Sequence, residues 1–263
     1  MRLIKLNDDG RFNLVWFAKD KIPSYAILSH TWGRGEDDEV TFKDIKDDIS
    51  NNEKKGFQKL KFCANQAKAD GLHYFWVDTC CIDKSNNNEL TTTINSMFRW
   101  YQNAERCYVY LSDVSVYTQD GQFRQEEWES AFRNSRWFTR GWTLQELLAP
   151  KIVEFYSRDG IRLGDKRSLE QQIHEITGIA VEALRGRHLC DFSVEERLRW
   201  GEKRQTTEEE DEAYCLLGIF EIFTSLKYGE GRKNAMDRLQ RKIQKSLNSR
   251  SQSSCKIPTA YLT

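Results

Sequence analysis

The segment 136–150, RWFTRGWTLQELLAP, sets two tryptophans and several apolar residues around one carboxylate, Glu146. Thr143 and Glu146 have the spacing of a capping box, in which the threonine accepts an N–H of the first helical turn and the glutamate returns to the backbone. Alternatively, a carboxylate in the first turn of a helix is kept ionised by the macrodipole and can serve a reaction. The segment leaves both interpretations open.

Polar side chains also stand at the ends of three apolar runs that are typical of strands, at 24–32, 73–83 and 106–114. They are Ser29, His30, Thr31, Trp32 and Gly33 after the first run, Asp78, Thr79, Cys80 and Asp83 after the second, and Ser112 and Asp113 after the third. Ligands of open α/β sheets bind at the carboxyl ends of strands, so these groups could hold a polyhydroxylated ligand such as a ribose. Turn capping by Ser29 and Thr31, and loop contacts of Asp78, are the structural alternatives.

The elements that must position these residues follow from the apolar pattern. Each run, with a fourth at 151–157, is too apolar to alternate, which is typical of parallel strands buried on both faces. Helical patterns at 57–71, at 89–105 and through 142–149 separate them. We therefore expect an α/β fold, an open and mainly parallel sheet flanked by helices with right-handed crossovers.

The pattern becomes helical after about residue 165. Further helices are expected at 168–179, 194–203, 211–220 and 234–247. We predict an α/β core over 1–165, a helical C-terminal part of the same domain over 166–248, and a disordered Ser-rich tail over 249–263. The acidic run 208–212, EEEDE, is expected to be a solvated loop or helix start.

Composition excludes several classes of function. The 263 residues carry no net charge, and their pI is about 6.9, so no nucleic-acid or anionic-membrane partner is indicated. No apolar run reaches the length of a membrane span, and the N-terminus lacks a signal peptide, which favours a cytoplasmic protein. Seven cysteines without a CxxC pair, and scattered histidines, favour reduced thiols and no metal site. Glycine-rich phosphate loops and a G-x-S-x-G elbow are missing, which disfavours NTPases and α/β-hydrolases.

Four long motifs in order resemble the fungal heterokaryon-incompatibility (HET) domain. They are YAILSHTWG at 25–33, FWVDTCCIDK at 75–84, the segment 136–150, and EDEAYCLLGIF at 210–220 followed by YGEG at 228–231. The resemblance implies an effector of regulated cell death after non-self recognition. It also implies homo-oligomers on activation and an NTP-binding receptor module as partner, in cis or in trans.

The HET domain is itself distantly similar to the Toll/interleukin-1 receptor (TIR) domain, which has a flavodoxin-like sheet. GWTLQEL at 141–147 resembles the TIR segment that bears an essential glutamate, with Thr143 in place of a cysteine. This implies that the substrate is NAD, that Glu146 serves to cleave its nicotinamide–ribose bond, and that the reaction requires no cofactor. Ser29 and His30 match the positions where TIR domains line their nucleotide pocket.

The chemistry implied by this resemblance needs one anion beneath an oxocarbenium-like ribose, because nicotinamide leaves as a neutral base. Trp32 and Trp142 would flank the pyridinium ring by stacking, and Arg140 would pair with a phosphate. Core packing is the structural alternative for both tryptophans. A non-enzymatic module that recruits partners through homotypic contacts remains the alternative function.

Overall fold

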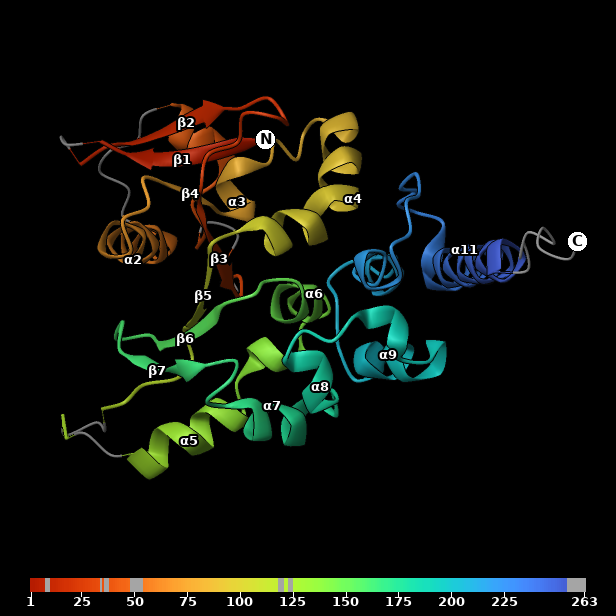
Figure 1. Ribbon diagram of the computed structural model, residues 1–263. Coiled ribbons are helices and arrows are strands. Elements are labelled where there is room, and N and C mark those ends of the chain that lie inside the picture. Colours follow the sequence, from red (N-terminus) through yellow and green to blue (C-terminus); the bar gives the residue numbers. More distant parts are fainter. Residues whose placement is uncertain are drawn as a thin grey trace, which may run out of the picture.

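The computed structural model describes residues 1–7, 10–33, 35, 38–47, 54–117, 121–122 and 125–254. Its centre is a seven-stranded sheet in the order β2-β1-β4-β3-β5-β6-β7, which runs from top to bottom in Figure 1. The middle strands β4, β3, β5 and β6 are parallel. They are the four strands expected from the apolar runs, and their bounds are Ala26–His30 (β3), Tyr74–Trp76 (β4), Arg106–Leu111 (β5) and Val153–Ser157 (β6).

Three short strands extend this parallel core with antiparallel edges that the apolar pattern does not predict. β1 (Arg2–Leu6) and β2 (Phe12–Trp16) form a hairpin beside β4, and β7 (Arg162–Asp165) pairs with β6. β2 and β7 are partly exposed, so their sequences lack a continuous apolar run. The hairpin turn uses Gly10, whose φ of 81° lies in the left-handed region.

The second expected strand is shorter than predicted. After β4 the chain turns at Val77 into the single helical turn α3 (Asp78–Cys81), in which the Cys81 N–H donates to the Val77 carbonyl. Asp78 is therefore the first residue of a helix that follows the strand. The two cysteines that looked like strand residues point into the core from this turn, where both are buried.

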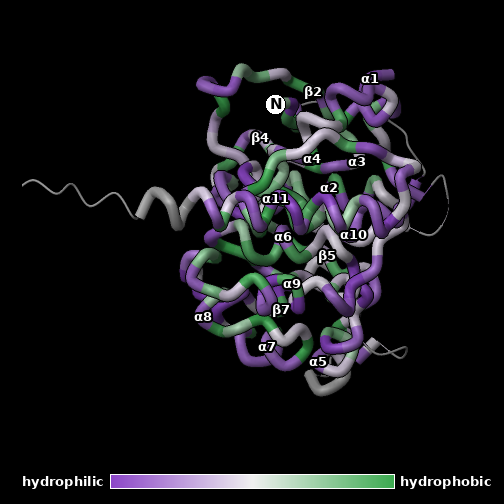
Figure 2. Tube along the Cα trace, turned by 90° about the vertical axis from the view of Figure 1, so that its right-hand side faces the viewer, coloured by the Kyte–Doolittle hydropathy of each residue, from purple (hydrophilic) through white to green (hydrophobic). Residues whose placement is uncertain are grey.

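Helices cover both faces of the sheet. α2 (Gly56–Ala69) packs on one face against β3 and β4, whereas α4 (Asn87–Asn103) and α6 (Thr143–Leu148) lie on the other, with α6 against β3 (Figure 1). Hydrophobic residues gather toward the centre around β5 and α6, and hydrophilic residues predominate on outer helices such as α7 and α11 (Figure 2). These crossovers give the parallel strands the order of a flavodoxin-like sheet, whose switch point lies between β3 and β5.

The C-terminal part is helical, as expected. Its elements are α7 (Glu170–Thr177), α8 (Val181–Leu184), η2 (Leu189–Asp191), α9 (Val194–Glu202), α10 (Asp211–Tyr214), η3 (Gly218–Phe220) and α11 (Gly231–Ser254). The run 211–220 is thus two short pieces instead of one helix. The remaining helical segments are α1 (Phe42–Lys46), α5 (Gln125–Arg133) and η1 (Arg136–Thr139).

The expected tail over 249–263 begins inside α11, and residues 255–263 of it lie outside the described part of the chain. Among the described helices, none has the length and apolar character that crossing a membrane requires.

Candidate active site

Glu146 lies on α6, but the capping-box prediction is wrong. The N-cap of α6 is Trp142, without a side-chain cap, and Thr143 is already inside the helix. The Thr143 hydroxyl bonds backwards, to the Trp137 carbonyl at 2.6 Å and the Arg140 carbonyl at 2.8 Å. Because Thr143 lies inside the helix and α6 has no side-chain cap, Thr143 and Glu146 do not form the reciprocal contacts of a capping box.

The carboxyl of Glu146 instead reaches the end of β3. Ser29 donates its hydroxyl to Glu146 Oε2, and the Trp137 indole N–H donates to the Ser29 oxygen at 2.8 Å. Ser29 and Trp137 are fully buried, and Glu146 is 6 % exposed. A chain of two hydrogen bonds thus fixes one carboxyl oxygen at the switch point of the sheet.

Burial changes the charge state of this carboxyl. It raises the pKa of Glu146 to about 8, against the opposing effect of the Ser29 hydrogen bond, while the nearby negative charge of Asp78 raises it further. The expectation that the helix start keeps Glu146 ionised is therefore reversed in the unliganded protein. α6 has only six residues, and desolvation outweighs its dipole.

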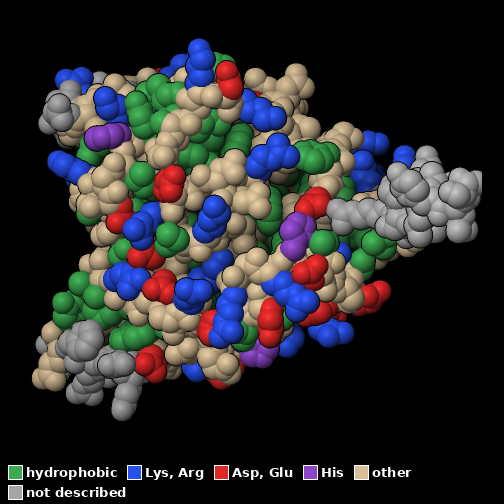
Figure 3. Space-filling view, viewed as in Figure 1, with side chains coloured by type: hydrophobic (Ala, Val, Ile, Leu, Met, Phe, Trp, Pro, Cys, Tyr) green, Lys and Arg blue, Asp and Glu red, His purple; other side chains and the backbone are tan. Residues whose placement is uncertain are grey.

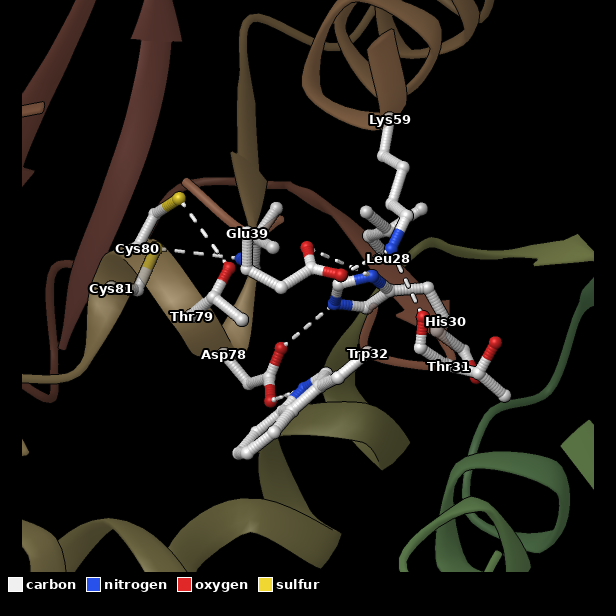
Figure 4. A network of polar contacts seen from close by, with 12 residues as sticks. Leu28, His30, Thr31, Trp32, Glu39, Lys59, Asp78, Thr79, Cys80 and Cys81 are labelled. Carbon is white, nitrogen blue, oxygen red and sulfur yellow. Dashed lines mark hydrogen bonds and ion pairs between the residues drawn. The ribbon is translucent and has the colours of Figure 1, made fainter. Parts of the chain in front are cut away.

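His30 and Asp78 form a second polar group, which Figure 4 shows together with Trp32. His30 Nε2 lies 3.1 Å from Asp78 Oδ1, and the Trp32 indole N–H donates to Asp78 Oδ2 at 2.9 Å. Burial would raise the pKa of Asp78, but the bond to His30 and the charges of His30 and Lys84 hold it well below its usual range. Asp78 therefore stays anionic and orients both rings.

The opposite nitrogen of His30 has no hydrogen-bond partner in the described structure. His30 Nδ1 lies 3.8 Å from Glu39 Oε2, and Glu39 is held by Lys59 and by the Gly33 N–H (Figure 4). Lys59 also donates to the Thr31 carbonyl at 2.9 Å. These contacts fix the turn that follows β3.

A cavity of about 440 Å³ opens in front of Glu146. Small-molecule sites typically have volumes of roughly 300–1,000 Å³. Six of the sequence-predicted residues line it, namely His30, Trp32, Asp78, Arg140, Trp142 and Glu146. Its apolar wall, which sequence reasoning missed, is made of Ile82, Leu90, Ile94 and Met97, the last three from α4.

The structure places the other three predicted residues outside this cavity. Ser29 lies behind Glu146, and the Thr31 hydroxyl faces Ser112 at 3.3 Å. Gly33 lines a neighbouring surface cavity beside α1, where its N–H contacts Glu39. In the described residues no cluster of three or more potential metal ligands occurs.

Two cations flank the exposed edge of the cavity. Lys84 Nζ lies 3.7 Å from the centroid of the Trp32 ring, and the Arg140 guanidinium lies 5.9 Å from it. Trp32 is 38 % exposed, so the two cations share an accessible aromatic ring at the rim. Lys84 and Arg140 are far apart in the sequence, so their common contact with the Trp32 ring could not be predicted from it.

The helical C-terminal part supplies the facing wall. The Trp142 indole N–H donates to Asp211 Oδ2 at 2.8 Å, and the Tyr228 hydroxyl donates to Asp211 Oδ1 at 2.9 Å. Burial raises the pKa of Asp211, opposed by these two hydrogen bonds. Thr207 and Glu208 complete this wall.

The acidic run 208–212 contains a helix start, one of the two expected alternatives, because α10 begins at Asp211. Its middle residue, however, is buried in a specific contact. Glu210 is 4 % exposed, and its Oε1 accepts the N–H groups of Gly229 and Gly231 at 2.8 Å. The motifs at 210–220 and 228–231, separate in sequence, thus meet in one contact that holds Tyr228 over the cavity.

A buried arginine ties this wall to α6. Arg204 donates to the Arg140 carbonyl at 2.9 Å and to the Thr143 hydroxyl at 2.8 Å. The backbone of Gln205 adds two bonds, one to the Thr139 carbonyl and one from the Gly141 N–H. The segment that carries Arg140 and Trp142 is thereby held from both ends.

Comparison with known proteins gives the family. Residues 25–125 match the model of the family described as heterokaryon incompatibility protein (HET). The chain carries a HET domain. Over 246 residues, 93 % of this chain, it is 54 % identical to the vegetative incompatibility protein HET-E-1 of Podospora anserina. An alignment of that length includes Glu146, which lies beyond the segment matched by the family model.

The chain spans only 18 % of the length of that relative. No solved structure matches the chain. The α/β fold of this HET domain therefore rests on its own sheet topology.

Proposed function

We propose that this HET domain is a cell-death effector of heterokaryon incompatibility and acts as an NAD glycohydrolase with Glu146 as its catalytic residue. The observation that carries the proposal is the position of Glu146, a buried carboxyl fixed by Ser29 at the strand ends and facing a cavity. Support for the biological role comes from the family match and from the incompatibility protein that the chain is similar to.

The proposed reaction consumes one water and gives nicotinamide, ADP-ribose and a proton. The C–N bond to the ribose breaks, its electron pair leaves with nicotinamide, and positive charge develops on the ribose. The Glu146 carboxylate stabilises that charge as an anion directly beside it. Water then attacks the ribose carbon and loses its proton.

The raised pKa of Glu146 fits a cationic substrate. A pyridinium next to the carboxyl favours the ionised form, so binding of NAD would lower the pKa that burial has raised. The free protein thus avoids a buried unpaired charge, and the substrate itself generates the catalytic anion.

The rest of the cavity suits the other parts of NAD. Trp142 and the apolar wall from α4 offer faces for flat rings, and Arg140 with Lys84 offers two cations for the diphosphate. The indole N–H groups of Trp32 and Trp142 are both bonded to carboxylates, which fixes the ring orientations before a ligand arrives.

The direct experiment incubates purified protein at high concentration with NAD and measures nicotinamide by chromatography. We expect release by the wild type, and a loss of at least about 100-fold in Glu146→Gln, because the anion beside the developing charge is removed. The matched control is Glu154→Gln, another buried glutamate, on β6 and outside the cavity, which should retain the rate. Equal rates in the wild type and Glu146→Gln would reject the proposal.

A cellular experiment separates the enzyme from a non-enzymatic signalling module. Expression of the wild type should kill fungal cells, and expression of Glu146→Gln at equal level should not. Killing by Glu146→Gln would favour a module that acts through homotypic contacts. We propose homo-oligomers on activation, and an NTP-binding receptor module as partner, for either outcome.

A further inference from the structure

A second cavity, of about 380 Å³, lies at the other end of α6. It is bounded by Leu148 to Lys151 after α6, by residues 183–190 around α8, and by residues at η3. It shares no lining residue with the cavity in front of Glu146. The two cavities therefore lie against opposite ends of the same short helix.

The lining of this second cavity is strongly basic. Five lysine or arginine side chains face it, and Glu221 is the one carboxylate among the lining residues; the five are Lys151, Lys166, Arg185, Arg187 and Arg197. Arg185 pairs with Glu170 and Arg187 with Asp191, but neither acid lines the cavity. Among the lining residues themselves, lysine and arginine thus outnumber carboxylates by five to one. In the lower half of the view in Figure 3, lysine and arginine side chains are interspersed with carboxylates.

Lys166 is a buried basic residue of this lining whose ammonium can donate to a ligand. Its side chain is buried, at 7 % exposure, and donates to the Leu147 carbonyl at 3.1 Å and the Pro150 carbonyl at 2.6 Å. An ammonium has three protons to donate, so these carbonyls account for two. Burial lowers the pKa of Lys166 to about 8, which a bound anion would reverse.

Apolar side chains also line this cavity. They are Phe98, Leu184 and Ile219, and the Phe98 side chain packs against Gly218. The lining therefore offers apolar contacts for a flat ring together with cations for an anion. The volume suits a molecule of mononucleotide size better than a bare ion.

We propose that this second cavity binds a nucleoside monophosphate, with Lys166 as the buried contact of the phosphate and Lys151 and Arg187 as its exposed contacts. The site is separate from the proposed NAD site and does not depend on NAD cleavage.

The test is isothermal titration of the full chain with AMP, inorganic phosphate and adenosine. AMP should bind more tightly than phosphate or adenosine, because it can use both the basic and the apolar side chains of the lining. Lys166→Met should weaken AMP binding about 10-fold, the effect of one charge-assisted hydrogen bond. Because Lys166→Met also removes two hydrogen bonds of a buried side chain, the exposed double variant Lys151→Gln with Arg187→Gln tests the same site without that loss and should weaken binding several-fold.

Three further variants test the location. Glu221→Gln removes the carboxylate of the lining and should tighten AMP binding, whereas Lys233→Gln, an exposed lysine on α11, should leave it unchanged. Trp32→Ala, at the first cavity, should also leave it unchanged. The proposal fails if AMP does not bind at millimolar concentration, or if Trp32→Ala abolishes binding while the lysine variants do not. It also fails if only vesicles with phosphorylated lipid headgroups bind.

Discussion

At the residue scale, the decisive group is a carboxyl whose surroundings oppose its ionisation. Glu146 accepts a hydrogen bond from Ser29, interacts with the Tyr101 hydroxyl and lines the cavity. Burial has the larger effect and places its pKa near 8. The charge state of this group therefore varies across the physiological range.

The pH dependence of NAD cleavage should report that pKa. If the anion is the active form, kcat/KM rises with pH through about 8 and levels off above it. The profile of kcat should have its midpoint at lower pH, because the bound pyridinium favours the anion. Initial rates between pH 5 and 10 give both profiles. A rate that falls as pH rises through this range contradicts the assignment.

Ser29→Ala should move the same midpoint to higher pH. The Ser29 hydroxyl lowers the pKa of Glu146, so its removal leaves desolvation less opposed and slows cleavage several-fold at pH 7. The variant also leaves the Trp137 indole N–H without its acceptor, which costs about 1–3 kcal/mol of stability. Circular dichroism at each pH confirms that the fold persists. An unchanged midpoint would show that Ser29 does not act through Glu146.

Stability should vary with pH in the opposite direction to activity. The folded-state pKa of Glu146 is raised above its unfolded value, so the protonated group stabilises the fold fully below about pH 4.5. That stabilisation is lost as pH rises through about 8. Glu146→Gln stays neutral, so its Tm relative to the wild type should increase by several °C, roughly, between pH 5 and 9. Scanning calorimetry measures the difference, and a constant offset would contradict the pKa.

The residues of the site differ in how well they can be predicted from the sequence. Glu146, His30 and Asp78 stand directly after apolar runs or in a recognisable motif, and the structure brings them to one cavity. Asp211 stands in an acidic run, and such a run gives no sign of what it packs against. Only the fold shows that Trp142 and Tyr228 both donate to Asp211.

At the element scale, the segment between η1 and α6 depends on the absence of a side chain at Gly141. A Cβ there would lie 2.5 Å from Thr206 Cγ2 and 3.2 Å from Cys215 Sγ. Gly141→Ala should therefore separate this segment from Gln205, destabilise the protein by about 1–3 kcal/mol and raise the KM for NAD. Urea denaturation and initial rates measure these effects. Gly35→Ala, which would meet only the flexible Asp38 side chain at 3.3 Å, is the control.

The parallel strands and long helices were predictable, because burial on both faces and helical periodicity leave clear patterns. β1, β2 and β7 were not, since short strands that are only partly buried resemble loops. α3 was read as strand because its four residues are mostly buried, and burial hides the period of a single turn.

At the scale of the whole molecule, the α/β core and the helical part are joined by specific polar contacts. Asn95 on α4 exchanges two hydrogen bonds with the backbone of Thr224, at 2.8 and 2.9 Å. Lys166 and Arg204 make further bonds to α6 or its flanks. Side chains of the helical part thus help to hold the α6 segment of the core that lines the cavity, and α4 of the core holds the helical part in return.

Unfolding should accordingly be a single cooperative transition. Urea curves followed by tryptophan fluorescence and by far-UV circular dichroism should coincide, because the parts share their core contacts. Asn95→Ala removes both bonds to Thr224 and should lower the midpoint of both curves together. Two separate transitions in the wild type would show that the parts fold independently.

The pair of indoles at the cavity also has an optical consequence. Of the eight tryptophans, Trp32 and Trp142 are the ones that line the cavity, and both hold their indole N–H groups against carboxylates. A pyridinium ring stacked on either would accept an electron from the excited indole, so the protein carries a built-in quenching signal. Occupancy can therefore be followed by emission alone, without a label and before any bond is broken.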